Sequence, residues 1–281
     1  MTPGTTPTDD ALLSAAREGD RGALEALLER HQRRVFRFGL RMCGEEESAK
    51  DVLQETLLAA ARGIRDFRGA SSVSTWLYSI ARSFCVKARR TSKFAPEQVG
   101  SIEGSPGAVE VADARRSPEA DAAGKQIEAA LRDAIRALDP IYRETLVLRD
   151  VEGLPAPLVA EVLGISVEAV KSRLHRARLA VRERVSPALG IAPETSAPLA
   201  PASQACPDVL ALFSRKLEGE ISGDVCAEME RHVQSCDACR TRCDSLRATL
   251  ALCSRSGDEP VPPRVERSVR EALRKVLDAG A

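Results

Sequence analysis

The chain has 281 residues, 43% hydrophobic and only 3% aromatic, and its 41 basic side chains balance 41 acidic ones. No apolar run reaches the roughly 20 residues that a membrane helix needs, and the start lacks the charged-then-apolar layout of a signal peptide. We therefore expect a protein of the cytoplasm, without a membrane partner, made of about two or three packed domains.

Apolar residues in the first ninety positions follow the spacing of α-helices. Apolar residues recur at helical spacing around Leu27, between Val52 and Ala60, and from Trp76 to Ala81. The rest of the chain repeats this periodicity and contains no convincing alternation of the kind that forms strands. The pattern predicts an all-α fold, with a first helical domain over residues 11–90.

Two segments without a helical stripe divide the chain. Residues 91–124 are rich in Pro, Gly, Ser and Glu, and residues 186–205 contain four Pro and six Ala. Such compositions are typical of linkers. They leave a second helical domain at 125–185, a Cys-rich domain at 206–255 and an amphipathic helix at 264–278.

The second domain carries a helix-turn-helix pattern over residues 154–184. Pro157 suits a first helical turn, Gly164 a left-handed turn, and Ser166 the N-cap of the next helix. We expect that next helix to enter the major groove of DNA, although a solvated basic face has the same charge pattern. Its outer faces carry Lys171, Ser172, Arg173, His175, Arg176 and Arg178.

Six of the eight cysteines lie between Cys206 and Cys253. In a secreted protein such crowding would indicate disulfides, whereas in the cytoplasm it favours metal or redox chemistry. His232, Cys236, Cys239 and Cys243 are spaced 4, 3 and 4 residues apart, so they share one face of a helix. Completed by a ligand from a distant helix, such a face suits Zn²⁺, or a softer ion such as Cu(I) or Cd²⁺.

Two sets of motifs resemble extracytoplasmic-function (ECF) sigma factors. DVLQET and STWLYSIARSFCVKARR look like region 2 of that family, and AEVLGISVEAVKSRLHRARLAVRER looks like region 4. The resemblance implies that Asp51, Gln54 and Glu55 bind core RNA polymerase. It also implies that a basic helix holds the opened −10 element, and that the helix-turn-helix binds the −35 element. The basic residues of the helix that holds the −10 element are Arg82, Lys87, Arg89 and Arg90.

The Cys-rich segment has a resemblance of its own. CPDVLALFSRKLEGEIS and HVQSCDAC are similar to the zinc-binding anti-sigma domain, fused here as in metal-responsive, CorE-type sigma factors. This similarity implies four ligands. Cys226, Cys243 and Cys253 lie outside this set, and three roles stay open for them: binding a second metal, exchanging with the ligands, or forming a thiol–disulfide switch. The implied ligands are Cys206, His232, Cys236 and Cys239.

Together these patterns predict a sigma factor that is not an enzyme and that a metal- or redox-responsive domain regulates in cis by docking on the sigma domains. The alternative is a helix-turn-helix regulator with a purely structural zinc domain. We expect Trp76 to pack in the core rather than stack on a base, and Cys43 and Cys85 to be small core residues. The C-terminal helix could either dock on a sigma domain or cap the Cys-rich domain.

Overall fold

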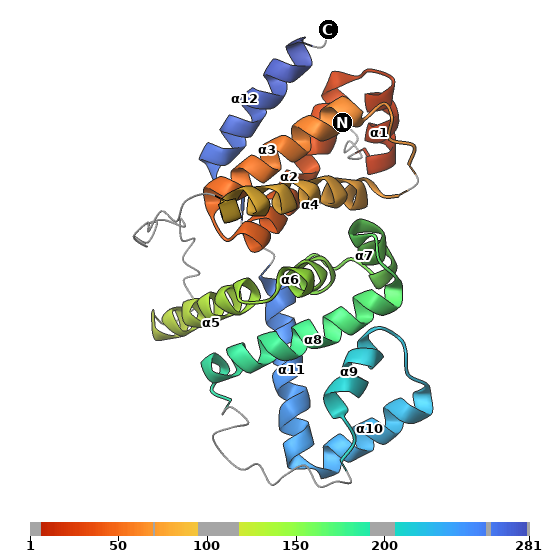
Figure 1. The fold of residues 1–281 in the computed structure, drawn as a ribbon, viewed down its shortest axis with the longest axis vertical. Helices are drawn as coiled ribbons and strands as arrows, with labels where there is room; N and C mark the ends of the chain where they lie inside the picture. The colour runs from red at the N-terminus through yellow and green to blue at the C-terminus, as the bar shows by residue number, and fades with distance from the viewer. Residues whose placement is uncertain (1–6, 70, 95–117, 192–205, 257–259, 280–281) are drawn as a thin grey trace, which may run out of the picture.

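The computed structural model of the protein describes residues 7–69, 71–94, 118–191, 206–256 and 260–279. Within these ranges every regular element is a helix (Figure 1), which confirms the predicted all-α fold. None of the described helices is both long and apolar enough to cross a bilayer.

Four helices form the first domain. The side chain of Asp20 caps the second of them by accepting a hydrogen bond from the backbone N–H of Ala23, and Gly44 ends that helix with a positive φ of 85°. Leu27, Phe38 and Leu53 are fully buried in the core that the four helices share. The helices are α1 (Asp9–Arg17), α2 (Arg21–Cys43), α3 (Glu46–Gly63) and α4 (Val73–Phe94).

The second domain contains the predicted helix-turn-helix. Gly164 adopts a φ of 66° at the turn, and the Ser166 hydroxyl accepts a hydrogen bond of 3.1 Å from the Ala169 N–H at the start of the second helix. Both turn predictions are therefore confirmed. The elements are α5 (Pro118–Arg136), α6 (Pro140–Leu146), the π-helix η1 (Val147–Val151), α7 (Ala156–Leu163), α8 (Val167–Val185) and the 3₁₀ helix η2 (Ser186–Leu189).

Helices extend into both segments that we expected to be linkers. Helix α4 continues to Phe94, and α5 begins at Pro118, where proline is tolerated in a first turn and the following Ala-rich sequence favours a helix. Beyond α8, the buried Ser186 hydroxyl lies 2.9 Å from that of Ser245, so η2 belongs to the packed structure. The middles of both segments lie outside the described residues.

The described residues of the C-terminal part form four more helices. The first three surround two small cores, one of Val209, Cys239 and Cys243 and one of Phe213, Met229 and Leu246. The elements are α9 (Val209–Leu217), α10 (Gly223–Ser235), α11 (Asp237–Arg255) and α12 (Pro263–Ala279). We call the three helices α9, α10 and α11 the Cys-rich module.

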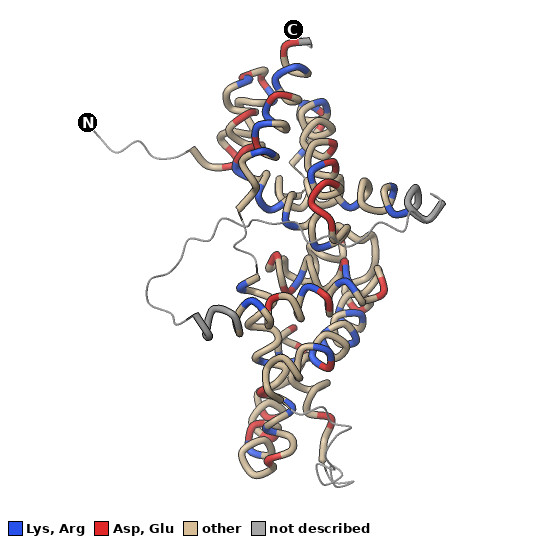
Figure 2. The backbone as a smooth tube through the Cα atoms, turned by 90° about the vertical axis from the view of Figure 1, so that its left-hand side faces the viewer, with Lys and Arg blue, Asp and Glu red and all other residues tan. Residues whose placement is uncertain are grey.

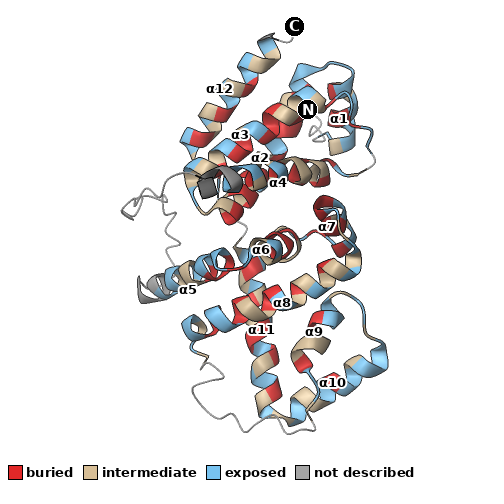
Figure 3. Cartoon of the chain, in the orientation of Figure 1, coloured by how far each residue is buried: buried red, intermediate tan, exposed pale blue. Residues whose placement is uncertain are grey.

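Within the module, helix α11 links α9 and α10 to the other domains. It crosses behind α8 (Figure 1), and at its far end Cys253 is fully buried in the large core that the first two domains share. There Arg41 of α2 donates a hydrogen bond of 2.8 Å to the carbonyl of Ser256, the C-cap of α11. Helix α12 then lies along α3, with buried positions recurring along its length (Figure 3).

Candidate metal centre and nucleic-acid interface

The four implied metal ligands meet at the start of α11. Cys206 precedes α9, His232 lies in the last turn of α10, Cys236 joins α10 to α11, and Cys239 lies in the first turn of α11. Their ligand atoms all lie within 4.8 Å of one another. Three separate segments of the chain therefore converge on one point.

The distances within this cluster fit a tetrahedral ion. The Sγ atoms of Cys206 and Cys236 are 4.0 Å apart, and Nε2 of His232 is 3.2 Å from Sγ of Cys239. With Zn–S bonds of about 2.3 Å, two sulfurs on a tetrahedral zinc ion lie about 3.8 Å apart. Three thiolates and one imidazole are also a donor set that zinc uses in closed structural sites.

The two cysteines on either side of the α11 N-terminus differ in acidity. The backbone N–H of Cys239 hydrogen-bonds to the sulfur of Cys236 and lowers the pKa of that thiol. Burial raises the pKa of the Cys239 thiol to about 12. A bound cation would offset that burial, because metal coordination stabilises the thiolate form.

The remaining C-terminal cysteines lie outside the cluster. Cys243 is buried against Val209, Cys253 is buried in the large core, and Cys226 lies on α10 with its sulfur 3.5 Å from Glu230. Burial raises the pKa of Cys253 to about 12. Among the described residues, the four-ligand group is the one set of His, Cys, Asp and Glu side chains close enough to hold an ion.

The proposed DNA-reading face of α8 contacts the Cys-rich module. Nζ of Lys171 lies 2.9 Å from a carboxylate oxygen of Glu220, in the turn between α9 and α10. Of the other expected DNA-binding residues on this helix, Ser172 and Arg176 are exposed, and Arg173 and His175 are half-buried. Acidic and basic residues are intermixed along the described backbone (Figure 2).

Arg178 is buried, contrary to the prediction. We expected it on an outer face of α8, but its side chain is only 1% exposed. Its position follows Leu174 by four residues and precedes Val181 by three, so it belongs to the apolar stripe. A charge can be buried there because two acids compensate it: Arg178 donates hydrogen bonds to Asp150 at 2.7 and 2.8 Å and to Glu218 at 2.8 Å.

Glu218 joins the Cys-rich module to the second domain. It ends α9, is almost fully buried, and accepts hydrogen bonds from Arg178 of α8 and, at 3.1 Å, from Arg149 of η1. Arg178 also donates to the hydroxyl of Ser214 on α9. This network was not predicted from the sequence, because its members come from three elements far apart in the chain, and the basic residues were considered there without their acidic partners.

Acids of the second domain also hold the basic helix of the first. Arg82 donates hydrogen bonds of 2.9 and 3.2 Å to Glu144 of α6. Glu152 accepts from Arg37 and, at 2.6 Å, from the hydroxyl of Tyr78. Burial next to the Glu152 carboxylate raises the pKa of Tyr78, so the phenol stays protonated and keeps donating.

The other predicted DNA-binding residues of α4 lie in the second half of that helix. Lys87 and Arg89 are exposed, and the side chain of Arg90 lies outside the described residues. Trp76 is half-buried and stacks on Phe67 with ring centroids 4.5 Å apart, so it packs against the core as expected.

The implied polymerase-binding residues share one surface. Asp51 and Glu55 are exposed on α3 and Gln54 is half-buried beside them. All three line a groove whose other wall is formed by Phe84 and Lys87 of α4. The structure thus brings these three side chains together on an accessible face of the first domain.

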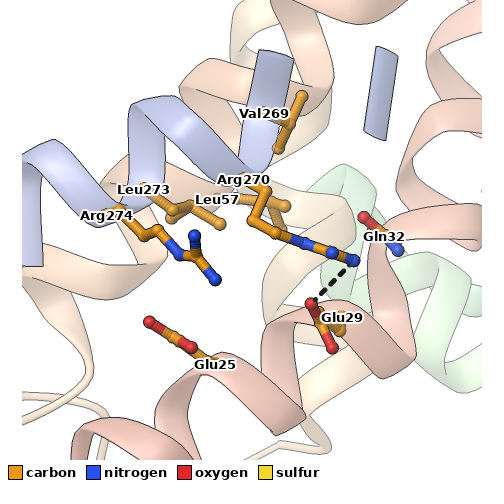
Figure 4. A pocket seen from close by; sticks show the side chains of 8 residues that line it. All are labelled: Glu25, Glu29, Gln32, Leu57, Val269, Arg270, Leu273 and Arg274. Atoms are coloured by element: carbon orange, nitrogen blue, oxygen red, sulfur yellow. Dashed lines mark ion pairs between the residues drawn. The ribbon is translucent and has the colours of Figure 1, made fainter. Parts of the chain in front are cut away.

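Helix α12 docks on the first domain rather than on the Cys-rich module. Its apolar residues Val269 and Leu273 line a pocket together with Leu57 of α3 (Figure 4). At the pocket edge Arg270 forms an ion pair of 3.1 Å with Glu29, and further along Arg264 forms one of 2.7 Å with Glu46. Of the two alternatives for this helix, docking on a sigma-like domain is the one observed.

Three family models match the chain in succession. They are Sigma-70 region 2 over residues 27–94, Sigma-70 region 4 over residues 128–181, and a putative zinc-finger over residues 206–240. The matched ranges contain the DVLQET motif, most of the helix-turn-helix and the four clustered ligands, respectively.

Curated proteins and solved structures are similar as well. The RNA polymerase sigma-H factor of Pseudomonas aeruginosa is 31% identical over 66% of this chain and 97% of its own length. The ECF RNA polymerase sigma factor SigM of Mycobacterium tuberculosis is 33% identical over 61% and 81%. The structure of CnrH in complex with the cytosolic domain of CnrY has 27% identity and a TM-score of 0.44, and the match covers 62% of this chain and 94% of that one.

Proposed function

The chain belongs to the extracytoplasmic-function family of RNA polymerase sigma factors, and from this premise we propose how its parts divide the work of transcription initiation. Sigma factors of this family direct core polymerase to promoters. We assign polymerase binding and −10 recognition to residues 11–90, and −35 recognition to residues 125–185. Control is assigned to residues 206–255 together with the helix over 264–278. In this proposal the chain works in the cytoplasm and catalyses no step itself.

Individual residues take roles that match their surroundings. Asp51, Gln54 and Glu55 offer acceptors to a basic surface of polymerase. The helix α4 supplies cations that track the phosphates of the opened strand, and α8 supplies cations and polar groups to the major groove. The proposed contacts on α4 are Arg82, Lys87, Arg89 and Arg90, and those on α8 are Lys171, Ser172, Arg173, His175 and Arg176.

We infer further that the arrangement described here is a closed, inhibited state. The observation that carries this inference is that Glu220 of the Cys-rich module holds Lys171 at 2.9 Å, while Glu144 holds Arg82. To contact Lys171 and Arg82, DNA phosphates would have to displace Glu220 and Glu144, because phosphate and carboxylate compete for the same cation. Docking of the module therefore opposes promoter binding, which gives its control a direction: inhibition.

The metal would support this docking. Cys206, His232, Cys236 and Cys239 tie the start of α9 to α10 and α11, and Glu218 and Glu220 lie at the far end of α9. Zn²⁺ is the ion that the donor set fits best, and the three thiolates also suit Cu(I) or Cd²⁺. Replacement or loss of the ion would loosen α9 and with it the acidic turn.

In vitro transcription tests both parts of the proposal. Metal-loaded full-length protein would be combined with core polymerase and a cognate promoter, and the variant Glu218→Gln/Glu220→Gln compared with the wild type. We expect more transcript from the double variant, because Lys171 is released. Glu228→Gln, on the exposed side of α10 in the same module, is the matched control and leaves the yield unchanged.

The outcomes separate the two claims. Equal yields from wild type and double variant would disprove inhibition by the acidic turn while leaving the sigma function intact. Absence of transcript from every variant on every template would instead disprove the assignment of promoter recognition to these residues.

A further inference from the structure

Two cysteines outside the Cys-rich module face each other in the first domain. Cys43 is the last residue of α2 and Cys85 lies in the middle of α4, and their Sγ atoms are 4.0 Å apart. The sequence alone predicts no more than two separate core residues. The structure instead makes them a pair contributed by two helices, well separated along the chain from the four clustered ligands.

The two members of this pair differ in access. Cys43 is half-buried, whereas Cys85 is only 5% exposed. Arg143 of α6 donates a hydrogen bond of 2.9 Å to the carbonyl of Met42, which places its guanidinium beside Cys43. A reagent arriving from solvent therefore meets Cys43 first, next to a positive charge that favours its thiolate form.

The pKa values of the two thiols differ as well, and the more accessible thiol has the lower pKa. The hydrogen bond with Cys85 lowers the pKa of Cys43, and the charges of Arg143 and Arg89 act in the same direction. The same hydrogen bond, together with burial, raises the pKa of Cys85. Cys43 is thus suited to attack an oxidant, and Cys85 to wait as the resolving thiol.

We propose that Cys43 and Cys85 form an oxidisable dithiol that a peroxide converts into a disulfide between α2 and α4. The bond requires the sulfurs, now 4.0 Å apart, to approach to about 2 Å. Nothing in this step involves the ligands of the metal cluster, so the first domain has a thiol site of its own.

The chemistry balances in two steps. The Cys43 thiolate attacks one oxygen of hydrogen peroxide, the O–O bond breaks, and the products are a sulfenic acid and a hydroxide that takes up a proton to become water. The sulfur of Cys85 then attacks the sulfur of Cys43, the S–O bond breaks, and the departing hydroxide leaves as water with the proton of Cys85. Two electrons pass from the two sulfurs to the peroxide.

The location gives the disulfide a structural consequence. Cys85 shares one face of α4 with Arg82 and Arg89, because the three are spaced i, i+3 and i+7. That face contacts the second domain through the bond between Arg82 and Glu144. Oxidation would therefore fasten the basic helix to the end of α2 at the boundary between the two sigma domains.

Peptide mapping of the metal-loaded full-length protein tests the proposal. After brief treatment with hydrogen peroxide, blocking of free thiols and digestion with trypsin without reductant, Cys43 falls in peptide 42–50 and Cys85 in peptide 83–87. We expect these two peptides linked, with two hydrogens fewer than their summed masses, and released by reductant. Cys43→Ser and Cys85→Ser each abolish the linked species, and Cys226→Ser retains it.

Other products would overturn the proposal. If Cys43 accumulates as a sulfinic acid while Cys85 is still alkylated after unfolding, the two sulfurs do not react with each other. A link from Cys43 to a cysteine of the Cys-rich module would equally disprove the pair. A sample whose metal content stays constant during the treatment keeps this readout separate from oxidation of the metal ligands.

Discussion

The C-terminal part of the chain holds the two sigma domains through contacts of opposite character. Helix α9 of the Cys-rich module meets the second domain through the charges of Arg178, Asp150 and Glu218, whose side chains are 1%, 8% and 4% exposed. Helix α12 meets the first domain through a buried apolar stripe, with ion pairs only at its exposed edges. The C-terminal part thus uses electrostatics where α9 meets the second domain and hydrophobic burial where α12 meets the first.

The difference determines how each contact can be released. A buried ion network depends on all its members, because the loss of one leaves the others desolvated and unpaired. An apolar stripe loses stability in increments that follow the area removed. The charged contact is therefore suited to a switch between two states, and the apolar contact to a permanent anchor that keeps the tail close to its target.

Loss of the metal should produce the largest effect and should separate the two contacts. Structural zinc sites contribute an apparent binding free energy of about 10–16 kcal/mol in small domains, and the cores of this module are small. We expect Cys239→Ser to unfold α9 and α10. Hydrogen exchange should then accelerate in α8 but not in α3, where α12 stays bound. Cys226→Ser, outside the cluster, is the control, and faster exchange in α3 as well would show that the two contacts are a single unit.

The next largest effect is expected from Arg178→Met. Removing the guanidinium leaves Asp150 and Glu218 buried without a counter-charge, which costs roughly 3–5 kcal/mol for a pair of this kind. Denaturant unfolding of the full chain measures the loss. Arg184→Met, on the exposed side of the same helix, should change stability by less than about 0.5 kcal/mol. Equal losses for the two variants would show that the buried network contributes nothing specific.

Leu273→Ala tests the apolar anchor. Leu273 is 6% exposed and packs at the edge of the first domain, so we expect a loss near the lower limit for such truncations, about 2 kcal/mol. The measurement is hydrogen exchange in α3, which should accelerate while exchange in α8 is unchanged. Lys275→Ala, on the exposed side of α12, serves as control. A loss that disappears in high salt would contradict a hydrophobic contact.

Much of the local structure was predictable from the sequence, because it follows from neighbouring residues. The turn at Gly164 and the cap at Ser166 depend on backbone preferences that act within a few positions. His232, Cys236 and Cys239 do meet as their spacing predicted, but not on one helical face: the helix breaks at Cys236, between α10 and α11, and Cys243 lies outside the cluster. Cys206 was added through the family resemblance alone.

The contacts between domains were not predictable in the same way. The burial of Arg178 requires Asp150 and Glu218, which approach it only after the domains have packed. The pairing of Cys43 with Cys85 likewise depends on how α2 crosses α4. Such contacts join residues tens of positions apart, and no periodicity in a single sequence records which of them meet. They also decide which basic residues are free to meet DNA.

The exposed ion pairs of α12 should have the smallest effect. Arg264 and Glu46 are 2.7 Å apart, but their side chains are 69% and 35% exposed. Solvent screens such a pair, and exposed pairs typically contribute less than about 1 kcal/mol. We expect Glu46→Gln to leave exchange in α3 nearly unchanged at physiological salt and to weaken α12 binding slightly at low salt. An effect as large as that of Leu273→Ala would mean that charge, and not apolar burial, anchors α12, and would remove the contrast between the two contacts.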